Sequence, residues 1–228
     1  MSDSSLTPSN QEIKDYLDRR FGQENALLHS IRLQSHEEHL PDIQVPIHVG
    51  RMLYLLAKIQ QPKNILEIGT LGGYSTAWLA QALSPQGRLI SLEINAEYAA
   101  KARRHLQNVK GKKIEIRVGH AVELLAYLDS AKEGHFDLIF IDADKENNVL
   151  YLDWSLRLSR AGTLILIDNL IPKGQKIGYP SHEEAKAIYA FNDYLAQHPL
   201  LEVAALPTLV GSQGRLDALA LAYVKKII

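Results

Sequence analysis

Two short polar segments contain the side chains best suited to chemistry: Asp142-Ala143-Asp144-Lys145 and Asp168-Asn169. Each ends a nearly continuous apolar run, which is typical of a strand buried on both faces of a parallel sheet. The carboxyl ends of such strands meet at one edge of the sheet, so we expect Asp142, Asp168 and Asn169 to lie together there. Two carboxylates and an amide oxygen are hard ligands that suit Mg²⁺, Mn²⁺ or Ca²⁺ rather than Zn²⁺. The pattern therefore predicts a site for a divalent cation.

The same acidic residues also allow an ordinary structural explanation. They could cap helices, or pair with Lys145 and other basic groups. Unpaired carboxylates that converge at one place repel each other, however, and a bound cation removes that cost. We therefore favour the metal site.

Three earlier segments carry weaker signals for a nucleotide-like ligand. Residues 67–75, Glu-Ile-Gly-Thr-Leu-Gly-Gly-Tyr-Ser, form a glycine-rich turn that lets the backbone approach a ligand closely. They lack the Gly-x-Gly-x-x-Gly dinucleotide fingerprint, because no glycine stands two residues after Gly69. Glu93, about twenty residues further on, is suited to accept both ribose hydroxyls. The small residues of Gly119-His120-Ala121 would leave room for a flat adenine ring. Each segment is also compatible with a plain turn or strand end.

The elements that must position these residues follow from the periodicity of the chain. Apolar or alternating runs predict strands at 64–69, 88–93, 113–119, 136–142, 163–168, 201–206 and 217–225. Helical patterns fall between and after them, at about 74–83, 96–108, 120–132, 147–159 and 183–197. This alternation predicts an α/β fold with a doubly wound, Rossmann-like sheet of seven strands.

The segment before the first strand has a different pattern. Residues 1–11 are expected to be a loose tail, and residues 12–60 show helical spacing, with a third helix from about Ile47. We interpret residues 1–60 as an N-terminal helical cap on the sheet. The whole chain, residues 1–228, is expected to be a single domain.

Composition excludes several classes of protein. The chain has 228 residues, 46% of them hydrophobic, and its 25 basic and 26 acidic residues give a net charge of −1, unlike a strongly basic nucleic-acid binder. The absence of cysteine excludes disulfides and thiolate metal sites. The polar stretch from Met1 to Gln11 is not typical of a signal peptide, and no apolar run approaches the ~20 residues that span a bilayer. We expect a cytoplasmic protein that does not enter a membrane.

In combination and order, these motifs resemble the metal-dependent O-methyltransferases that include caffeoyl-CoA and catechol O-methyltransferases, particularly their small bacterial members. The resemblance runs from about Val45 to the C-terminus. It implies the class I methyltransferase fold, S-adenosyl-L-methionine as methyl donor, a divalent cation, a phenolic small-molecule substrate and a homodimer.

The resemblance also implies roles for particular residues. Glu67, Gly69 and Ser75 would line the methionine end of the cofactor, Glu93 would hold its ribose, and Ala121 would back its adenine. Asp142 and Asp144 would lie close to the cofactor, and Val45 would contact it from the N-terminal side. Asp142, Asp168 and Asn169 would bind the metal. Lys145 would sit beside the acceptor hydroxyl and act with Asp142 in catalysis.

The chain departs from the family where the substrate is expected. Ile171-Pro172-Lys173 replaces an aromatic residue that many relatives have after Asp-Asn. Asn148 stands where a tyrosine is common, although Tyr151 fits a later tyrosine. Near the C-terminus, Asp217-Ala218 replaces the usual Asp-Gly. The identity of the methyl acceptor is the property that these changes affect.

Other functions remain open at this point. Some relatives are said to methylate tRNA, and the basic cluster of Arg103, Arg104, Lys110, Lys112 and Lys113 could contact RNA, although a solvated helix end explains it better. A noncatalytic cofactor-binding protein would not need metal ligands at the acceptor position. A nicotinamide-dependent dehydrogenase would need the missing glycine fingerprint.

Overall fold

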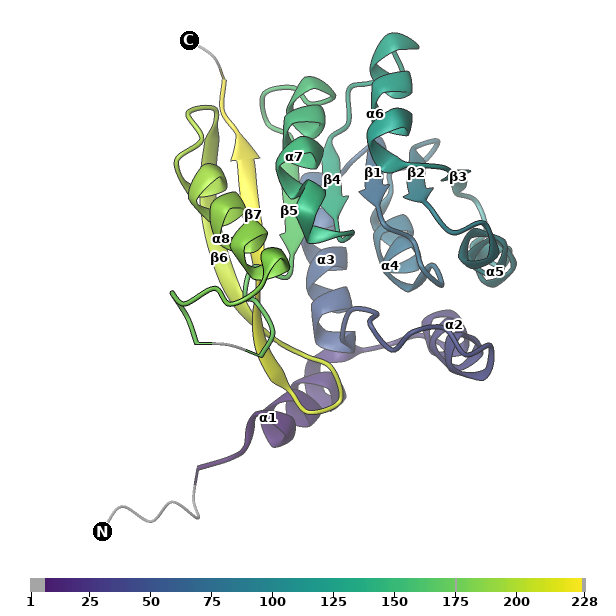
Figure 1. Cartoon of the computed structure of the whole chain (residues 1–228). Coiled ribbons are helices and arrows are strands. Elements are labelled where there is room, and N and C mark those ends of the chain that lie inside the picture. The colour runs from purple at the N-terminus through teal and green to yellow at the C-terminus, as the bar shows by residue number, and fades with distance from the viewer. Residues whose placement is uncertain (1–6, 175, 227–228) are drawn as a thin grey trace.

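The computed structural model describes residues 7–174 and 176–226 and has a seven-stranded sheet at its centre (Figure 1). The strands are β1 (Asn64–Ile68), β2 (Arg88–Glu93), β3 (Lys113–Val118), β4 (Leu138–Ile141), β5 (Leu164–Asp168), β6 (Leu201–Val210) and β7 (Arg215–Val224). Their order in the sheet is β3-β2-β1-β4-β5-β7-β6. Strands β1 to β5 are parallel, and β7 runs antiparallel to β5 and β6. The strand order reverses between β1 and β4, which is where such sheets bind ligands.

Helices cover both faces of the sheet (Figure 1). On one face lie α3 (Ile47–Gln60), α4 (Tyr74–Ala82) and α5 (Ala96–Leu106), and on the other α6 (Ala121–Ser130), α7 (Asn148–Arg157) and α8 (Glu183–Ala196). Successive strand residues point to opposite faces, so Ile65 packs in the first core and Leu66 in the second. This double burial explains why the parallel strands are nearly continuous apolar runs.

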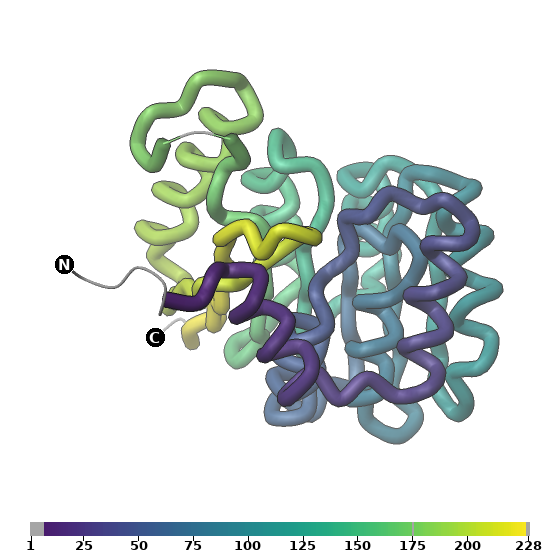
Figure 2. The backbone as a smooth tube through the Cα atoms, turned by 90° about the horizontal axis from the view of Figure 1, so that it is seen from below, coloured from purple at the N-terminus to yellow at the C-terminus, as the bar shows by residue number. Residues whose placement is uncertain are grey.

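The N-terminal helices lie across the carboxyl edge of the sheet, as the view from below shows (Figure 2). They are α1 (Asn10–Leu17), the short π-helix η2 (Asp18–Gly22) and α2 (Ala26–Glu37). The turn between β6 and β7 reaches α1, and a Cβ on Gly214 would approach the Asn10 carbonyl carbon to 2.7 Å. Helices are therefore present before the first strand, as expected, and they lie at the edge where the polar residues were predicted. The division of residues 1–60 as a cap segment stays a prediction.

The predicted Rossmann-like fold of the class I methyltransferases is confirmed, although several element boundaries differ: β4 covers only residues 138–141 of the predicted 136–142, and β7 begins at Arg215, two residues earlier than predicted. The tail was expected to extend to residue 11, but α1 begins at Asn10, because Ser9 and Glu12 form a reciprocal capping box. Residues 1–6 lie outside the described part of the chain. Strand β6 continues four residues beyond the predicted 206, through Pro207, which an edge strand tolerates because one of its sides needs no ladder hydrogen bonds. The expectation of a single domain over residues 1–228 stays a prediction.

Within residues 7–174 and 176–226, no helix combines the length and the apolar character needed to cross a membrane.

Candidate active site

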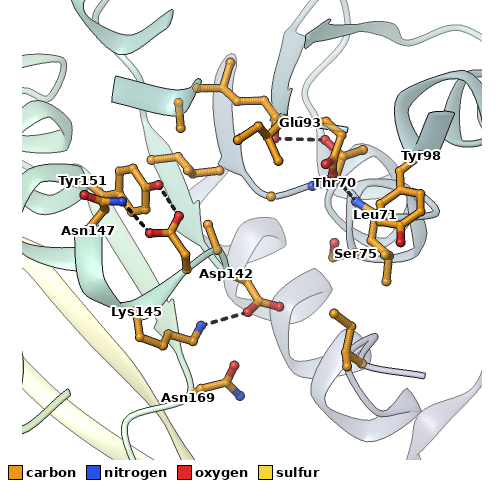
Figure 3. Close-up of a pocket in the computed structure, with 18 of the residues that line it drawn as sticks. Thr70, Leu71, Ser75, Glu93, Tyr98, Asp142, Lys145, Asn147, Tyr151 and Asn169 are labelled. Atoms are coloured by element: carbon orange, nitrogen blue, oxygen red, sulfur yellow. Dashed lines mark hydrogen bonds and ion pairs between the residues drawn. The ribbon is translucent and has the colours of Figure 1, made fainter. Parts of the chain in front are cut away.

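A cavity of about 940 Å³ opens at the carboxyl ends of β1, β2 and β4 (Figure 3). Nine of the eleven predicted site residues line it: Val45, Gly69, Ser75, Glu93, Ala121, Asp142, Asp144, Lys145 and Asn169. These residues come from six separate parts of the sequence, and the parallel strands bring them to one place. The residues that line the cavity include both Ala121, where the adenine was predicted to lie, and Asp142, where the metal was predicted to bind.

The glycine-rich turn after β1 forms one wall of the cavity. Gly69 has a φ of +97°, and a Cβ there would lie 2.0 Å from the carbonyl oxygen of Asp142. Only glycine therefore lets the ends of β1 and β4 approach this closely. Gly73, with a φ of +82°, is the N-cap of α4. The turn leads directly into Tyr74 and Ser75, which both line the cavity.

Glu67 lies below the cavity and does not line it. Its carboxylate is fully buried and accepts hydrogen bonds from Ser75 (2.7 Å), Thr76 (2.5 Å) and Ser91 (2.6 Å). Burial raises its pKa to about 7, although the three hydroxyls work in the opposite direction. These hydroxyls hold Glu67 within the protein, so its predicted contact with the methionine end of a cofactor stays a prediction.

Glu93, at the end of β2, bridges the glycine-rich turn and the next loop. One carboxylate oxygen accepts hydrogen bonds from the backbone N–H groups of Thr70 (3.2 Å) and Leu71 (2.8 Å), and the other from Asn95 (2.9 Å) (Figure 3). Glu93 thus shapes the turn and still faces the cavity. The position suits the predicted ribose contact, because each oxygen can accept more than one hydrogen bond.

The segment after β4 presents two carboxylates with different partners. The Asp142 carboxylate accepts a hydrogen bond from the Lys145 ammonium group at 3.2 Å (Figure 3). Asp144 instead accepts hydrogen bonds from the Tyr151 hydroxyl and the Asn147 amide, both at 2.5 Å. Burial and the Asp144 charge raise the pKa of Tyr151, so its hydroxyl remains a donor. The two carboxylates are therefore oriented separately, Asp144 by α7 and Asp142 by Lys145.

The end of β5 completes the predicted acidic set. Asp168 is 3% exposed, and its Oδ2 accepts one hydrogen bond, from the Asn169 amide at 3.3 Å. Its Oδ1 is buried and has no hydrogen-bond partner in the part of the chain that the structure describes. Lys145 also reaches this strand end, 3.4 Å from the backbone oxygen of Asp168. Asp168 and Asn169 line a smaller pocket of about 270 Å³, and Asn169 lines both cavities.

The electrostatics of this cluster fit a cation. Burial and the negative charge of Asp142 raise the pKa of Asp168, and Asp217 acts in the same direction. Within residues 7–174 and 176–226, no three His, Cys, Asp or Glu side chains group closely enough to hold a metal ion, and the predicted set has two carboxylates and one amide. The buried Oδ1 of Asp168 is nonetheless the kind of oxygen ligand that a hard cation binds.

Sequence reasoning missed several residues of the cavity. Tyr98, near the start of α5, lies beside Leu71 on one side of the cavity (Figure 3), and the Asn147 amide donates to Asp144. The sequence could have indicated both residues, because each follows the end of a predicted strand by only a few positions. Lys173 also lines both cavities. Asp217, which contacts the Asn169 amide at 3.1 Å, was noted only as part of a family motif.

Comparisons with known proteins agree with this geometry. The family model described as O-methyltransferase matches residues 19–213. The chain is 39% identical to a catechol O-methyltransferase of Mycobacterium tuberculosis over 219 residues, covering 96% of this chain and 97% of that protein. It is also 39% identical to a catechol O-methyltransferase of Niastella koreensis, covering 94% and 97%.

A solved structure gives the same result in three dimensions. The O-methyltransferase from Bacillus cereus in complex with SAH superposes with a TM-score of 0.86 at 38% identity, covering 93% of this chain and 97% of that one. The match extends over nearly the full length of both chains. The chain belongs to the O-methyltransferase family and is a methyltransferase enzyme.

Proposed function

We propose that the protein transfers a methyl group from S-adenosylmethionine to one hydroxyl of a small phenol with two adjacent hydroxyls, and that it requires a divalent cation. The observation that carries the proposal is the buried, unpartnered Oδ1 of Asp168 among described residues, beside Asp142 and Asn169. The relatives named catechol O-methyltransferase and the bound SAH of the Bacillus cereus enzyme support the substrate class and the methyl donor.

The cavity has the features that S-adenosylmethionine needs. Glu93 offers carboxylate oxygens for ribose hydroxyls, and Ala121 is a small residue at the start of α6 where an adenine ring would lie. Ser75 and Gly69 border the opposite part, for the methionine end, and Val45 covers it from the N-terminal segment. The donor supplies a sulfonium methyl group, which is already a strong electrophile, so the protein must mainly position and activate the acceptor.

The acidic set fits a hard divalent cation, of which Mg²⁺, Mn²⁺ and Ca²⁺ are candidates. Asp142, Asp168 and Asn169 would hold it through oxygen atoms. When bound, the cation supplies Lewis-acid stabilisation of a deprotonated hydroxyl, and two adjacent hydroxyls suit its coordination.

Lys145 is the residue we propose as general base. Its ammonium group lies between the Asp142 carboxylate and the backbone oxygen of Asp168, and its side chain is only 10% exposed. Both neighbours hold the nitrogen in place. The ammonium group would first release a proton to solvent, and the neutral amine would then take the proton of the acceptor hydroxyl. Proton transfer by a positioned side chain contributes typically about 10²–10⁴-fold to a rate.

The deciding experiment measures methyl transfer from labelled S-adenosylmethionine to a panel of catechols, with Mg²⁺ and with excess chelator. Transfer that requires the metal supports the proposal. Full activity in chelator contradicts the metal requirement. Binding of S-adenosylmethionine without transfer to any catechol contradicts the substrate class and directs the search to tRNA, whose binding would weaken steeply with salt.

Part of the basic cluster has contacts within the protein. Arg104 pairs with Glu38, which compensates its charge. Arg103 and Lys112 donate to the carbonyls of Ile116 and Leu83 and keep their positive charge. The homodimer remains a proposal based on the family resemblance, and the cytoplasmic location remains one based on the sequence of the N-terminal segment and the lack of a long apolar run.

A further inference from the structure

Asp217, on β7, is a fully buried carboxylate that the proposed mechanism does not use. It does not line either cavity at the carboxyl edge of the sheet. A buried carboxylate is costly unless hydrogen bonds and opposite charge compensate it. Its partners therefore indicate why it is present.

The two oxygens of Asp217 have different partners. Oδ1 accepts hydrogen bonds from the backbone N–H groups of Ile171 (2.9 Å) and Ala218 (2.8 Å). Oδ2 accepts hydrogen bonds from the Asn169 amide (3.1 Å) and the Arg215 guanidinium group (2.5 Å). The carboxylate therefore joins β7 to the loop that follows β5, and it meets that loop at the candidate metal ligand.

These contacts determine which way the Asn169 amide points. Its Nδ2 donates to Oδ2 of Asp168 (3.3 Å) and to Oδ2 of Asp217 (3.1 Å). Its oxygen consequently lies on the other side, toward Asp142 and Lys145 (Figure 3). The backbone of Asn169 also has a φ of +65°, an uncommon conformation outside glycine that Asn adopts more readily than most residues.

We propose that Asp217 is a positioning residue that fixes the Asn169 amide with its oxygen toward the candidate metal site. The carboxylate oxygens of Asp168 and Asp217 are both hydrogen-bond acceptors and lie on the same side of the Asn169 amide. The amide nitrogen, which donates, must therefore face them. Arg215 compensates the charge of Asp217 and also donates to the Ile171 carbonyl at 3.2 Å, which holds the same loop. The inference rests on the proposed function, because it assigns the amide oxygen to a metal.

Asp217→Asn tests the orientation with almost no change in shape. The two backbone donors at Ile171 and Ala218 demand an acceptor, so the new amide oxygen must take the place of Oδ1. Its nitrogen then faces the Asn169 nitrogen, and two donors meet. The Asn169 amide must rotate, which removes its oxygen from the metal side.

Asn169→Asp combined with Asp217→Asn exchanges donor and acceptor. The new amide nitrogen at position 217 can donate to the new carboxylate at position 169, and the total charge of the cluster is unchanged. An oxygen again faces the metal side. If Asp217 had a purely structural role, the losses of metal affinity caused by the two substitutions would add in the double variant. The positioning role instead predicts that the double variant binds the metal more tightly than Asp217→Asn does.

Asp137→Asn is a matched control at the opposite edge of the sheet. Asp137 is 7% exposed, accepts hydrogen bonds from the backbone N–H groups of Lys63 (2.8 Å) and Asn64 (3.0 Å), and pairs with Arg160. It has the same set of partners as Asp217, two backbone donors and one arginine, but no contact with the candidate site. Its substitution should lower stability while leaving metal affinity unchanged.

The experiment uses Mn²⁺ as probe, measured by electron paramagnetic resonance in the presence of S-adenosylhomocysteine. We expect Asp217→Asn to weaken Mn²⁺ binding about 10- to 100-fold, as is usual when a residue that orients a ligand is lost. Asp137→Asn should keep the wild-type affinity, and the double variant should regain part of the loss. Wild-type Mn²⁺ affinity in Asp217→Asn overturns the proposal, and so do additive losses.

A second readout needs no metal. The side-chain amide of Asn169, identified in the ¹⁵N spectrum by its absence in Asn169→Asp, should shift in Asp217→Asn and stay in place in Asp137→Asn. An unchanged signal in Asp217→Asn overturns the positioning role. A wild-type protein that binds no Mn²⁺ contradicts the proposed function instead, and the amide spectrum still decides the orientation.

Discussion

Two buried carboxylates at the carboxyl edge of the sheet have opposite surroundings. Glu67, on β1, has three hydroxyl donors that occupy both of its oxygens. Asp168, at the end of β5, has one long hydrogen bond from Asn169 and an oxygen with no partner within the described residues. Burial raises the pKa of both groups. Hydrogen bonds from the protein reach both oxygens of Glu67, whereas within the described residues they reach only one oxygen of Asp168.

The different surroundings of Glu67 and Asp168 indicate different roles, one in stability and one in the candidate site. Hydroxyl groups at Ser75, Thr76 and Ser91 offset the cost of burying Glu67 and connect α4 to β1 and β2. Burial of Asp168 costs more, because its neighbours Asp142 and Asp217 are also acidic. This contrast supports the proposed cation, which would relieve the repulsion between the carboxylates.

The largest effect is expected from Asp168→Asn. Removing a ligand of a metal that contributes several kcal/mol should lower turnover by roughly a thousandfold or more. The same change removes a buried, incompletely paired charge, so the metal-free protein should be as stable as wild type or more stable. Labelled methyl transfer and calorimetric melting in chelator measure the two quantities. A clear loss of stability with activity retained would place Asp168 with Glu67 in the scaffold.

Lys145→Met is expected to have the next largest effect. The substitution keeps much of the side-chain length but removes the amine beside Asp142, so kcat should fall about 10²- to 10⁴-fold while S-adenosylmethionine affinity changes little. Steady-state kinetics and isothermal titration test this. Lys186→Met, which removes an exposed ammonium group paired with Glu183, is the control. A change in KM alone would show that Lys145 binds substrate without taking its proton.

Glu67→Gln should affect stability instead of turnover. At about pH 5 the carboxyl group of Glu67 is protonated and carries one hydrogen, because its pKa is about 7. The amide nitrogen of Gln carries two, and the second needs a further acceptor among Ser75, Thr76 and Ser91, so the variant should lose about 1–3 kcal/mol. Chemical denaturation measures this, with the exposed Glu184→Gln, which lines neither cavity, as control. Unchanged stability together with weak S-adenosylmethionine binding would assign Glu67 to the cofactor.

The stability difference between wild type and Glu67→Gln should also depend on pH. The pKa of Glu67 is raised from 4.5 to about 7, so the folded protein holds this proton more tightly than the unfolded chain. The stabilisation that protonated Glu67 gives the folded state is fully present below pH 4.5, and it is lost as the pH rises through about 7. Denaturation curves across this range test it, and a difference that grows with pH would contradict it.

Asp18 has a pKa shift opposite in sign to that of Glu67, and its substitution should have the smallest effect on stability. Burial works to raise its pKa, but hydrogen bonds from His48 and Lys14 outweigh it and lower the pKa to about 2. Its stabilisation is therefore present above 3.8 and is lost as pH falls toward 2. Asp18→Asn should be destabilised at neutral pH, with the difference disappearing in acid.

The sequence alone determined the architecture and the location of the site. Continuous apolar runs indicated strands buried on both faces, and the polar residues at their ends had to meet at one edge. This logic is local: a side chain that follows a parallel strand is positioned by that strand. Asp142, Asp168 and Asn169 could therefore be named without coordinates, as could Gly69 and Glu93.

Only the tertiary structure decided what each of these carboxylates does. Glu67 and Asp168 are both acidic residues on predicted strands, and their difference comes from hydroxyls and carboxylates on other elements. Asp217 is the clearest case, because it contacts Asn169 across 48 positions of sequence. The start of α1 and the length of β6 also depended on contacts, through a capping box and an edge position. Hydrogen-bond partners between distant segments have no periodicity, so only the folded chain reveals them.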